Sequence, residues 1–331
     1  MFITLGRSEN IFKDSHNANI LDLETFSIDS LKKLQNVEID SNIICTGISR
    51  IYDYKNEVVI FSKLQQQVFI SDSKGRLFKF ITLKDLKLLP GQKIEDFFIN
   101  TLTDNLVFLI SGSENKILNT DFAGIPFSQT ILSHRYKELK ISGNYIYLLS
   151  YPNETSNLAQ LFVIDRLANK THLLTEQYIS TKFEMSSQSR ELISIGNCLY
   201  YTRLFDNTIY SIKEFMIRPI CTINLGNYVL PENDLLYSKS LSDFLEDCKV
   251  NNYVYSLNKI ANTEKYIFIN TNNSNTICYS KQKHISKILT ALDGFDSIES
   301  TINYFPMEGE GNRVAFLFKN NDKGTSMVIC E

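Results

Sequence analysis

Residues 48–81 read ISRIYDYKNEVVIFSKLQQQVFISDSKGRLFKFI and contain four strand-like segments. The apolar run Val58–Phe61 is too short for a helix and is rich in β-branched and aromatic residues, which is typical of a strand buried on both faces. The segment ISRIY precedes this run, and a further strand-like segment begins at Val68. The turn sequence DSKG at 72–75 then leads into RLFKFI. The stretch therefore predicts four antiparallel strands joined by turns.

The same arrangement recurs along the chain. Six apolar runs begin 48, 39, 53, 68 and 48 residues apart, and each is followed 10 to 16 residues later by another strand-like segment. The runs are Val58–Phe61, Leu106–Ile110, Tyr145–Leu149, Cys198–Tyr201, Tyr266–Ile269 and Val314–Phe318. Four strands in roughly 40 to 50 residues are typical of one propeller blade. We therefore expect an all-β fold, a six-bladed β-propeller with four-stranded antiparallel blades.

The sixth repeat is incomplete, because the chain stops at Glu331 directly after its third strand. The strand-like segment Ala18–Leu23 precedes the first repeat and has no other place in the pattern. We expect it to be the outer strand of the last blade, because a ring closed by an N-terminal strand leaves no open sheet edge there. Residues 1–331 would then form a single propeller domain with an N-terminal tail over residues 1–17.

One interval between repeats is longer than the others, and a predicted helix accounts for it. After Pro231, the apolar residues Leu241, Phe244, Leu245 and Cys248 recur at helical spacing. Either Ser238 or Ser240 is placed to be the N-cap. We expect a helical insertion over residues 231–250 that packs over one end of the ring.

The charge and hydropathy patterns argue against two classes of partner. The 34 Lys and Arg residues nearly balance the 37 Asp and Glu residues, the net charge is −3, and neither sign forms a long block. A strong positive field of the kind that attracts nucleic acid is therefore not expected. No apolar run approaches the roughly 18 residues that indicate a membrane helix. We expect no nucleic-acid partner, no transmembrane segment and a monomer.

The six cysteines are widely separated. They stand at positions 45, 198, 221, 248, 278 and 330, and no C-x-x-C pair occurs. All except Cys248 lie in apolar strand-like runs, where a free thiol behaves as a small hydrophobic group. We expect six unpaired thiols, with one or two disulfides between adjacent strands as the alternative in an oxidising compartment.

No motif indicates catalysis or metal binding. The four histidines, His16, His134, His172 and His284, fall in four different repeats and form no H-x-x-H or H-E-x-x-H pattern. The nucleophile elbow G-x-S-x-G is also missing from the sequence. We expect no catalytic residue, no metal site and no cofactor.

The predicted loops are longer on one face of the ring. The connections between blades and between second and third strands open on the same face, which we call the elaborated face, and the opposite one the short-turn face. The long connections are 82–95, 132–138, 150–159, 175–191, 202–207 and 225–250. Because rigid scaffolds commonly carry function on their longer loops, we expect a ligand to bind on the elaborated face.

The candidate ligand-binding residues on that face carry guanidinium, phenol or carboxylate groups, which bind anions, sugars and proteins. They are Arg135, Tyr136, Tyr151, Arg190, Arg203, Asp206 and Tyr237. Arg203 and Asp206 form the preferred pair, because together they offer a cationic fork beside an acceptor. The alternative is that these two residues pair with each other and hold their loop.

Two stretches, 19–131 and 195–292, resemble the six-bladed β-propeller (TolB-like) family of secreted bacterial lipoproteins. The resemblance rests on NANILDLE, ISRIYDYKNEVVIFS, QVFISDSKGRLFKFI, DFFIN and YYTRLFDNTIYSI. The family turn G-x-G-P-G-E-F/Y is replaced here by LLPGQKIEDFF, which keeps only Pro90, Gly91 and Glu95. The resemblance implies a periplasmic protein or a lipoprotein anchored in the outer membrane. Residues 1–5 are too short and wrongly flanked for a signal peptide, so we expect that signal to be missing from this sequence.

Two functional hypotheses remain open at this point. The first is a non-catalytic binding or scaffold propeller at the bacterial cell envelope, with an unknown protein or glycan partner on the elaborated face. The alternative is a channel-centred, metal-dependent hydrolase, lactonase or sugar lyase. Its acid and amide groups would be Asp53, Asn144, Asn197 and Asn252.

Overall fold

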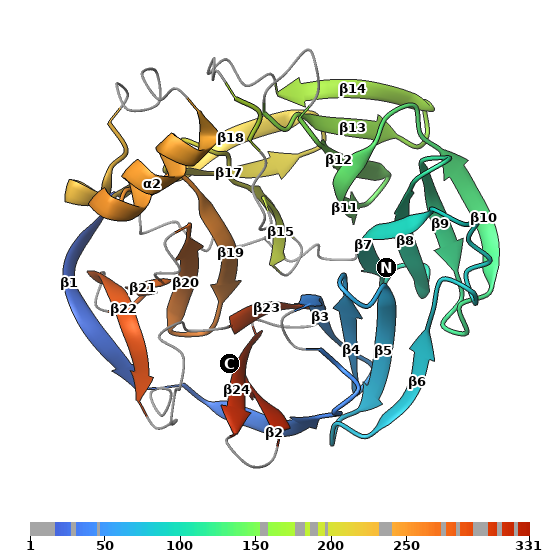
Figure 1. The fold of residues 1–331 in the computed structure, drawn as a ribbon, viewed down its shortest axis with the longest axis horizontal. Coiled ribbons are helices and arrows are strands. Elements are labelled where there is room, and N and C mark those ends of the chain that lie inside the picture. Colours follow the sequence, from blue (N-terminus) through green and yellow to red (C-terminus); the bar gives the residue numbers. More distant parts are fainter. Residues whose placement is uncertain are drawn as a thin grey trace, which may run out of the picture.

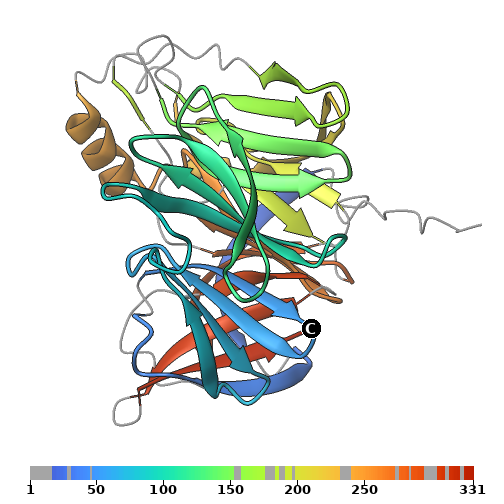
Figure 2. The same ribbon diagram turned by 90° about the vertical axis from the view of Figure 1, so that its right-hand side faces the viewer.

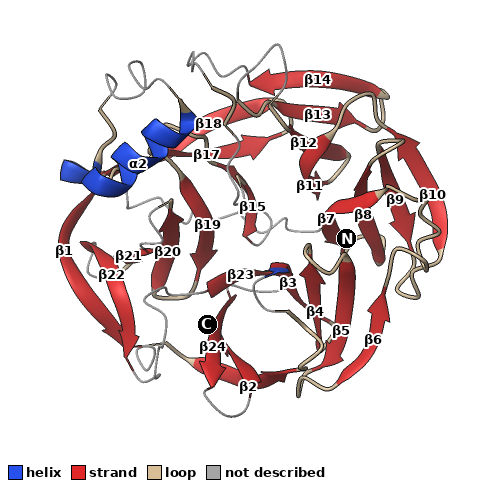
Figure 3. Cartoon of the chain, in the orientation of Figure 1, coloured by secondary structure: helices blue, strands red, loops and turns tan. Residues whose placement is uncertain are grey.

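In the computed structural model, six four-stranded blades surround a central axis (Figures 1 and 3). Hydrogen bonds join blades four and five through β1, and blades six and one through their inner strands, so the blades form four continuous sheets. The structure describes residues 17–27, 31–44, 47–152, 158–175, 183–185, 191–195, 198–231, 240–272, 276–282, 285–293, 304–309, 313–320 and 324–331. Within each blade, neighbouring strands are antiparallel, and the first strand lies nearest the axis. The expected all-β, six-bladed propeller is confirmed.

Blades one to three follow one another directly in the sequence. Blade one contains β3 (Ile48–Tyr54), β4 (Glu57–Ser62), β5 (Gln67–Asp72) and β6 (Leu77–Ile81). Blade two contains β7 (Lys93–Asn100), β8 (Asn105–Ser111), β9 (Lys116–Thr120) and β10 (Pro126–Ile131). Blade three contains β11 (Tyr136–Ser142), β12 (Tyr145–Ser150), β13 (Leu161–Asp165) and β14 (Lys170–Thr175).

Blades four to six complete the ring. Blade four contains β15 (Leu192–Ile195), β16 (Cys198–Tyr201), β17 (Thr208–Lys213) and β18 (Met216–Asn224). Blade five contains β19 (Leu257–Asn262), β20 (Tyr266–Thr271), β21 (Thr276–Ser280) and β22 (Ile285–Asp293). Blade six contains β23 (Tyr304–Gly309), β24 (Arg313–Asn320), β25 (Gly324–Cys330) and β2 (Lys33–Ile39).

The hydrophobic core is divided into six seams, one between each pair of neighbouring blades. Tyr52, Phe61, Phe97 and Phe108, for example, pack together between blades one and two. The other five seams are built in the same way. Because each inner sheet face is covered by the next blade, the second strands are apolar on both faces. This explains the continuous apolar runs that mark the repeat.

The expected closing strand is wrong, although an N-terminal strand does complete the last blade. The outer strand of blade six is β2, which pairs antiparallel with β25 from Lys33↔Cys330 to Ile39↔Thr325. Val37 of β2 is buried in the seam between blades six and one. The strand Lys33–Ile39 has only three apolar residues in seven, and the adjacent Gln35 and Asn36 break their alternation, so its hydrophobic signal is weaker than that of Ala18–Leu23. The inner strands β23 and β3 also pair in parallel, which links blade six to blade one.

The segment Ala18–Leu23 belongs instead to β1 (Asn17–Ser27), which runs along the outside of the ring. Residues 17–19 pair in parallel with β18 of blade four, and residues 20–27 pair in parallel with β22 of blade five. Strand β1 therefore joins two blades at their outer edges. The predicted tail, residues 1–17, lies outside the described residues apart from Asn17.

The predicted helix is present as α2 (Leu241–Asn251), and Ser240 is its N-cap. The Ser240 hydroxyl accepts a hydrogen bond from the backbone N–H of Asp243 at 3.2 Å. Phe244 and Cys248 point into a small apolar cluster with Leu158 and Leu204. Figure 2 shows α2 at one end of the ring, as expected for a packing helix. Of the predicted insertion 231–250, residues 232–239 lie outside the described ranges.

The start of blade five also differs from expectation. The sequence segment YVYSL at 253–257 suggests the first strand, but β19 begins only at Leu257. Tyr253 and Tyr255 pack against the α2 cluster instead, and Val254 makes a single parallel bridge to Val229. The aromatic residues that gave this segment its strand-like pattern therefore pack against the helix instead of continuing the strand.

Candidate functional site

The elaborated face is marked by a repeated hydroxyl residue. In blades one to five the second strand ends at, or one residue before, a buried Ser or Thr. These residues are Ser62, Ser111, Ser150, Thr202 and Thr271. Ser62 and Ser150 accept backbone N–H groups of the following loop, at 3.2 and 3.0 Å. In blade two, Ser111 instead donates to the carboxylate of Glu95, at 2.6 Å.

A bulge at the start of β7 turns Glu95 out of the regular strand pairing. Ile94 pairs with Ile110 and Asp96 with Leu109, so Glu95 is the extra residue. Two loops approach closely beside it, because a Cβ on Gly112 would lie 2.6 Å from the Gly91 carbonyl oxygen. Gly112 also has a φ of +137°, which a side chain would strain. The glycine thus lets the loop after Ser111 pack against the turn before Lys93.

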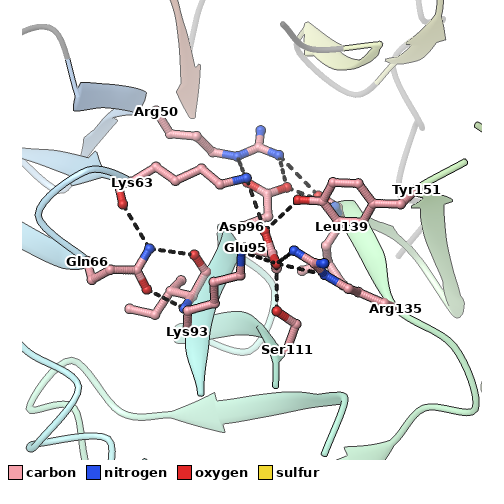
Figure 4. Close-up of polar contacts among 11 residues, drawn as sticks. Arg50, Lys63, Gln66, Lys93, Glu95, Asp96, Ser111, Arg135, Leu139 and Tyr151 are labelled. Atoms are coloured by element: carbon pink, nitrogen blue, oxygen red, sulfur yellow. Dashed lines mark hydrogen bonds and ion pairs between the residues drawn. The ribbon is translucent and has the colours of Figure 1, made fainter. Parts of the chain in front are cut away.

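The carboxylate of Glu95 is buried and collects donors from three blades (Figure 4). The guanidinium of Arg135 donates to Oε1 through Nε at 3.1 Å and through Nη2 at 2.7 Å. The phenol of Tyr151 donates to Oε2 at 2.7 Å. The Arg135 guanidinium also lies over the Tyr151 ring, 4.3 Å from its centroid. Residues from blades two and three therefore meet on one carboxylate.

Two lysines complete the arrangement. Lys63 Nζ lies 3.2 Å from Oε2 of Glu95, and Lys93 Nζ lies 3.2 Å from Oε1. The loop that carries Lys63 is tied to β7 by Gln66, whose amide accepts from Ile94 N at 2.5 Å and donates to Ile94 O at 3.0 Å. We call Lys63, Lys93 and Arg135 the basic cluster. Their side chains are 41%, 47% and 46% exposed, so the cluster faces solvent above a buried carboxylate.

These contacts fix the charge state of Glu95. Burial by itself would raise the pKa of Glu95, but hydrogen bonds from Ser111, Tyr151 and Arg135 outweigh it and lower the pKa to about 2. Burial and the hydrogen bond to Glu95 raise the pKa of the Tyr151 phenol, which keeps that phenol a donor. Glu95 is therefore a permanent anion that holds three cations together.

A second layer of charges lies deeper, between the inner strands. Arg50 of β3 and Asp96 of β7 form a buried, two-pronged ion pair, with Arg50 Nε 2.7 Å from Oδ1. Asp96 also accepts the backbone N–H of Leu139 at 2.8 Å. In the next seam, Lys137 Nζ lies 2.7 Å from Oε1 of the buried Glu191. Burial raises the pKa of Glu191. These groups join neighbouring blades and lie out of contact with solvent.

The structure brings two of the expected site residues together. Arg135 and Tyr151 meet on Glu95. Tyr136, by contrast, is 2% exposed and packs edge-on against Phe162 in the seam between blades two and three. Arg190 and Tyr237 lie outside the described residues.

The preferred pair, Arg203 and Asp206, occupies a separate place on the same face. Arg203 Nε lies 3.7 Å from Oδ2 of Asp206, and its guanidinium lies over the Tyr210 ring at 4.1 Å. Asp206 accepts from Thr208 N at 2.8 Å and from the Tyr210 hydroxyl at 2.6 Å. Asp206 is thus bonded within the loop between β16 and β17, whereas the buried Nε of Arg203 makes no hydrogen bond.

Sequence reasoning missed Lys63, Lys93 and Glu95 as members of a site. Lysines in loops carry little signal, because most such residues are simply solvated. Glu95 carried two sequence signals. It is a carboxylate inside the strand-like segment KIEDFFIN, and it is one of three residues kept from the family turn. A charged residue inside an apolar strand requires a partner, and here the partners come from other blades.

Of the four residues considered for a channel-centred enzyme, the three that the structure describes lie apart from one another. Asp53 forms an ion pair with Arg313. Asn144 is exposed in the turn between β11 and β12 on the short-turn face, and Asn252 is the C-cap of α2 on the elaborated face. Asn197 lies outside the described residues. Among the residues that the structure describes, no three His, Cys, Asp or Glu side chains are grouped as metal ligands.

Two further observations concern the chain as a whole. The cysteines at 198, 221, 248, 278 and 330 are free thiols, and Cys45 lies outside the described residues. None of the helices in the described part of the chain has the length and apolar character needed to cross a membrane.

Comparison with known proteins agrees with the fold. A family model described as "6-bladed beta-propeller" matches residues 35–314. No curated protein matches the chain. A solved structure from Bacteroides fragilis NCTC 9343, described as a "Putative exported protein", is similar with a TM-score of 0.69 and 12% identity, over 95% of this chain and 98% of that one. A protein of unknown function from Bacteroides thetaiotaomicron VPI-5482 has a TM-score of 0.51 and 10% identity, over 93% of this chain and 75% of that one.

Proposed function

The chain belongs to the 6-bladed beta-propeller family, and from this premise we propose that it is a non-catalytic binding protein that holds its ligand on the elaborated face. The observation that carries the proposal is the basic cluster. The cluster combines Lys63 after β4 of blade one, Lys93 at the start of β7 of blade two, and Arg135 directly before β11 of blade three. These side chains lie around one buried carboxylate and are about half exposed. A set of fixed, exposed cations on the loop-bearing face of a rigid ring is suited to recognition.

The chemistry of Glu95 favours binding over acid–base catalysis. A general acid or base works best when its pKa lies near the operating pH. Glu95 has a pKa of about 2 and is surrounded by hydrogen-bond donors, so it neither releases nor takes up a proton near neutrality. Its place at the centre of the cluster is that of a fixed counter-charge which positions cations.

The proposal extends to a TolB-like lipoprotein at the cell envelope, with a protein or glycan carrying the recognised group. It is supported by the likeness of the fold to the Bacteroides fragilis protein described as a "Putative exported protein". Fractionation of the cells that encode the chain, followed by immunoblotting, tests this part. Detection of the protein in the cytoplasmic fraction would contradict it.

A binding screen tests the function itself. The full-length protein is applied to arrays of envelope glycans, peptides and phosphorylated compounds, together with a Lys63→Gln/Arg135→Gln variant. Lys74→Gln, at an exposed lysine on the short-turn face, is the control. Binding that is lost only in the first variant supports the proposal. Binding that survives this variant but is lost in Lys74→Gln contradicts it, and so does chemical conversion of the bound compound detected by mass spectrometry.

A further inference from the structure

We infer that the basic cluster is a binding site for a compact, doubly charged oxyanion of the kind that a phosphate monoester presents at neutral pH. This inference rests on the proposed binding function and names the chemical class of the ligand. The site lies where the loops of blades one, two and three meet above Glu95 (Figure 4).

The number of donors at the site exceeds what Glu95 can accept. An ionised carboxylate offers about four lone-pair positions. The donors directed at Glu95 are Ser111 Oγ, Tyr151 Oη, two nitrogens of Arg135 and the ammonium groups of Lys63 and Lys93. Each ammonium carries three N–H donors, and a guanidinium carries five. Donors therefore remain available for a second acceptor.

The charges are also unbalanced in favour of an anion. Three cations face one carboxylate, which leaves two positive charges uncompensated within the cluster. The neighbouring acidic groups are occupied elsewhere. Asp96 pairs with Arg50 and with the backbone of Leu139, and Glu114 lies beside Lys116 at 3.5 Å. A ligand with two negative charges would make the cluster neutral.

The cluster is arranged before any ligand arrives. Lys93 stands at the first position of β7, and the loop of Lys63 is fixed to the same strand by Gln66. Arg135 is held between Glu95 and the Tyr151 ring through Nε and Nη2. Among the described residues no acceptor is bonded to Arg135 Nη1, so one edge of the guanidinium remains available. Pre-arranged donors lower the entropy cost of binding.

The geometry favours a small oxyanion over an extended polyanion. Lys93 and Arg135 end at the same carboxylate oxygen, and Lys63 ends at the other oxygen of that carboxylate. The three cations therefore converge on one place instead of forming a line along the surface. A single tetrahedral group with several acceptor oxygens can contact all three, because a guanidinium binds phosphate through two N–H groups and an ammonium binds it as a compact charge.

Isothermal titration calorimetry with inorganic phosphate and with methyl phosphate tests the inference. Saturable binding of both is expected, with acetate binding far more weakly at the same ionic strength. Lys63→Gln and Lys93→Gln should each weaken binding by about 10- to 150-fold, the usual effect of losing a charged hydrogen bond. Lys74→Gln, an exposed lysine of the short-turn face, is the matched control and should bind as the unaltered protein does. Thermal unfolding of each variant verifies that it is folded.

The outcomes separate this inference from the function on which it rests. If phosphate and methyl phosphate do not bind, while a compound from the array still depends on Lys63 and Arg135, the oxyanion class is wrong and the binding function stands. Equal losses in Lys63→Gln and Lys74→Gln would mean that phosphate binds by general surface charge, which also overturns the inference. If neither phosphate nor any array compound depends on the cluster, both proposals fail.

Discussion

The carboxylate of Asp96 accepts the backbone N–H of Leu139 at 2.8 Å, which joins the inner strand of blade two to that of blade three. Blade three repeats the contact, because Glu138 accepts the N–H groups of Glu191 and Leu192 at 3.1 and 2.9 Å. Carboxylates at the start of the inner strands thus tie successive blades together. Glu95, one residue before Asp96, also lies near the start of an inner strand, but it forms ion pairs with the cations of the basic cluster.

The buried pair of Arg50 and Asp96 should be strongly coupled. Arg50→Met leaves the buried charge of Asp96 unbalanced, and Asp96→Asn leaves the buried charge of Arg50 unbalanced. Each substitution should therefore lower the free energy of unfolding by about 3 to 5 kcal/mol. The double variant should lose clearly less than the sum of the two single losses. Urea unfolding of all four proteins measures the difference. Additive losses would show that the two side chains do not stabilise the ring as a pair.

Stability at acid pH should report on Glu95. Its pKa falls from 4.5 to about 2 in the folded protein, so the folded state gains stability above pH 4.5 and loses it as the pH falls toward 2. The shift corresponds to about 3 kcal/mol. The advantage of the unaltered protein over Glu95→Gln, measured by urea unfolding, should therefore shrink by about this amount between pH 6 and pH 2. Glu114→Gln, at a side chain 44% exposed on the same face, controls for net charge. A constant advantage across this range would contradict the assigned role of Glu95.

The two N-terminal strands, β1 and β2, should contribute unequally to the stability of the ring. Deleting residues 1–30 removes β1 from the outside of blades four and five and leaves blade six complete. Deleting residues 1–40 also removes β2, which exposes the edge of β25 and opens the seam that contains Val37. We expect a modest fall in melting temperature for the first deletion, and aggregation or a large fall for the second. Equal effects would show that β2 does not close the ring.

The stability of helix α2 should depend on the side chains of its buried face. Phe244 is buried among aromatic and aliphatic side chains, whereas its neighbour Leu245 is 38% exposed. Phe244→Ala should therefore cost about 3 to 5 kcal/mol of local stability, with Leu245→Ala as a control that costs far less. Hydrogen exchange across residues 241–251 measures both. Similar protection in the two variants would place the packing face elsewhere.

The buried thiols should react slowly in the folded protein. Burial raises the pKa of Cys330 to about 11, so little of its reactive thiolate exists at neutral pH. Iodoacetamide should modify Cys198, which is only half-buried, before the buried cysteines at 221, 248, 278 and 330. Under denaturing, non-reducing conditions, mass spectrometry should find six additions. Four or fewer additions, restored by a reductant, would reveal a disulfide.

The sequence by itself determined the blades and the helix. Runs such as Val58–Phe61 predicted second strands buried on both faces, and Leu241, Phe244 and Cys248 predicted the inner face of α2. These features follow from local spacing, because strands and helices are formed by neighbouring residues along the chain. The strand-like segment 253–257 is an exception, because Tyr253 and Tyr255 pack against α2 and β19 begins only at Leu257.

Only the tertiary structure decided which N-terminal strand completes blade six and which residues meet at Glu95. Both Ala18–Leu23 and Lys33–Ile39 can form strands, and the choice depends on hydrogen bonds to β25, almost 300 residues away in the sequence. Lys63, Glu95 and Arg135 likewise stand in separate repeats. A residue's pairing across blades depends on the closure of the ring, a property of the whole chain that local patterns do not encode.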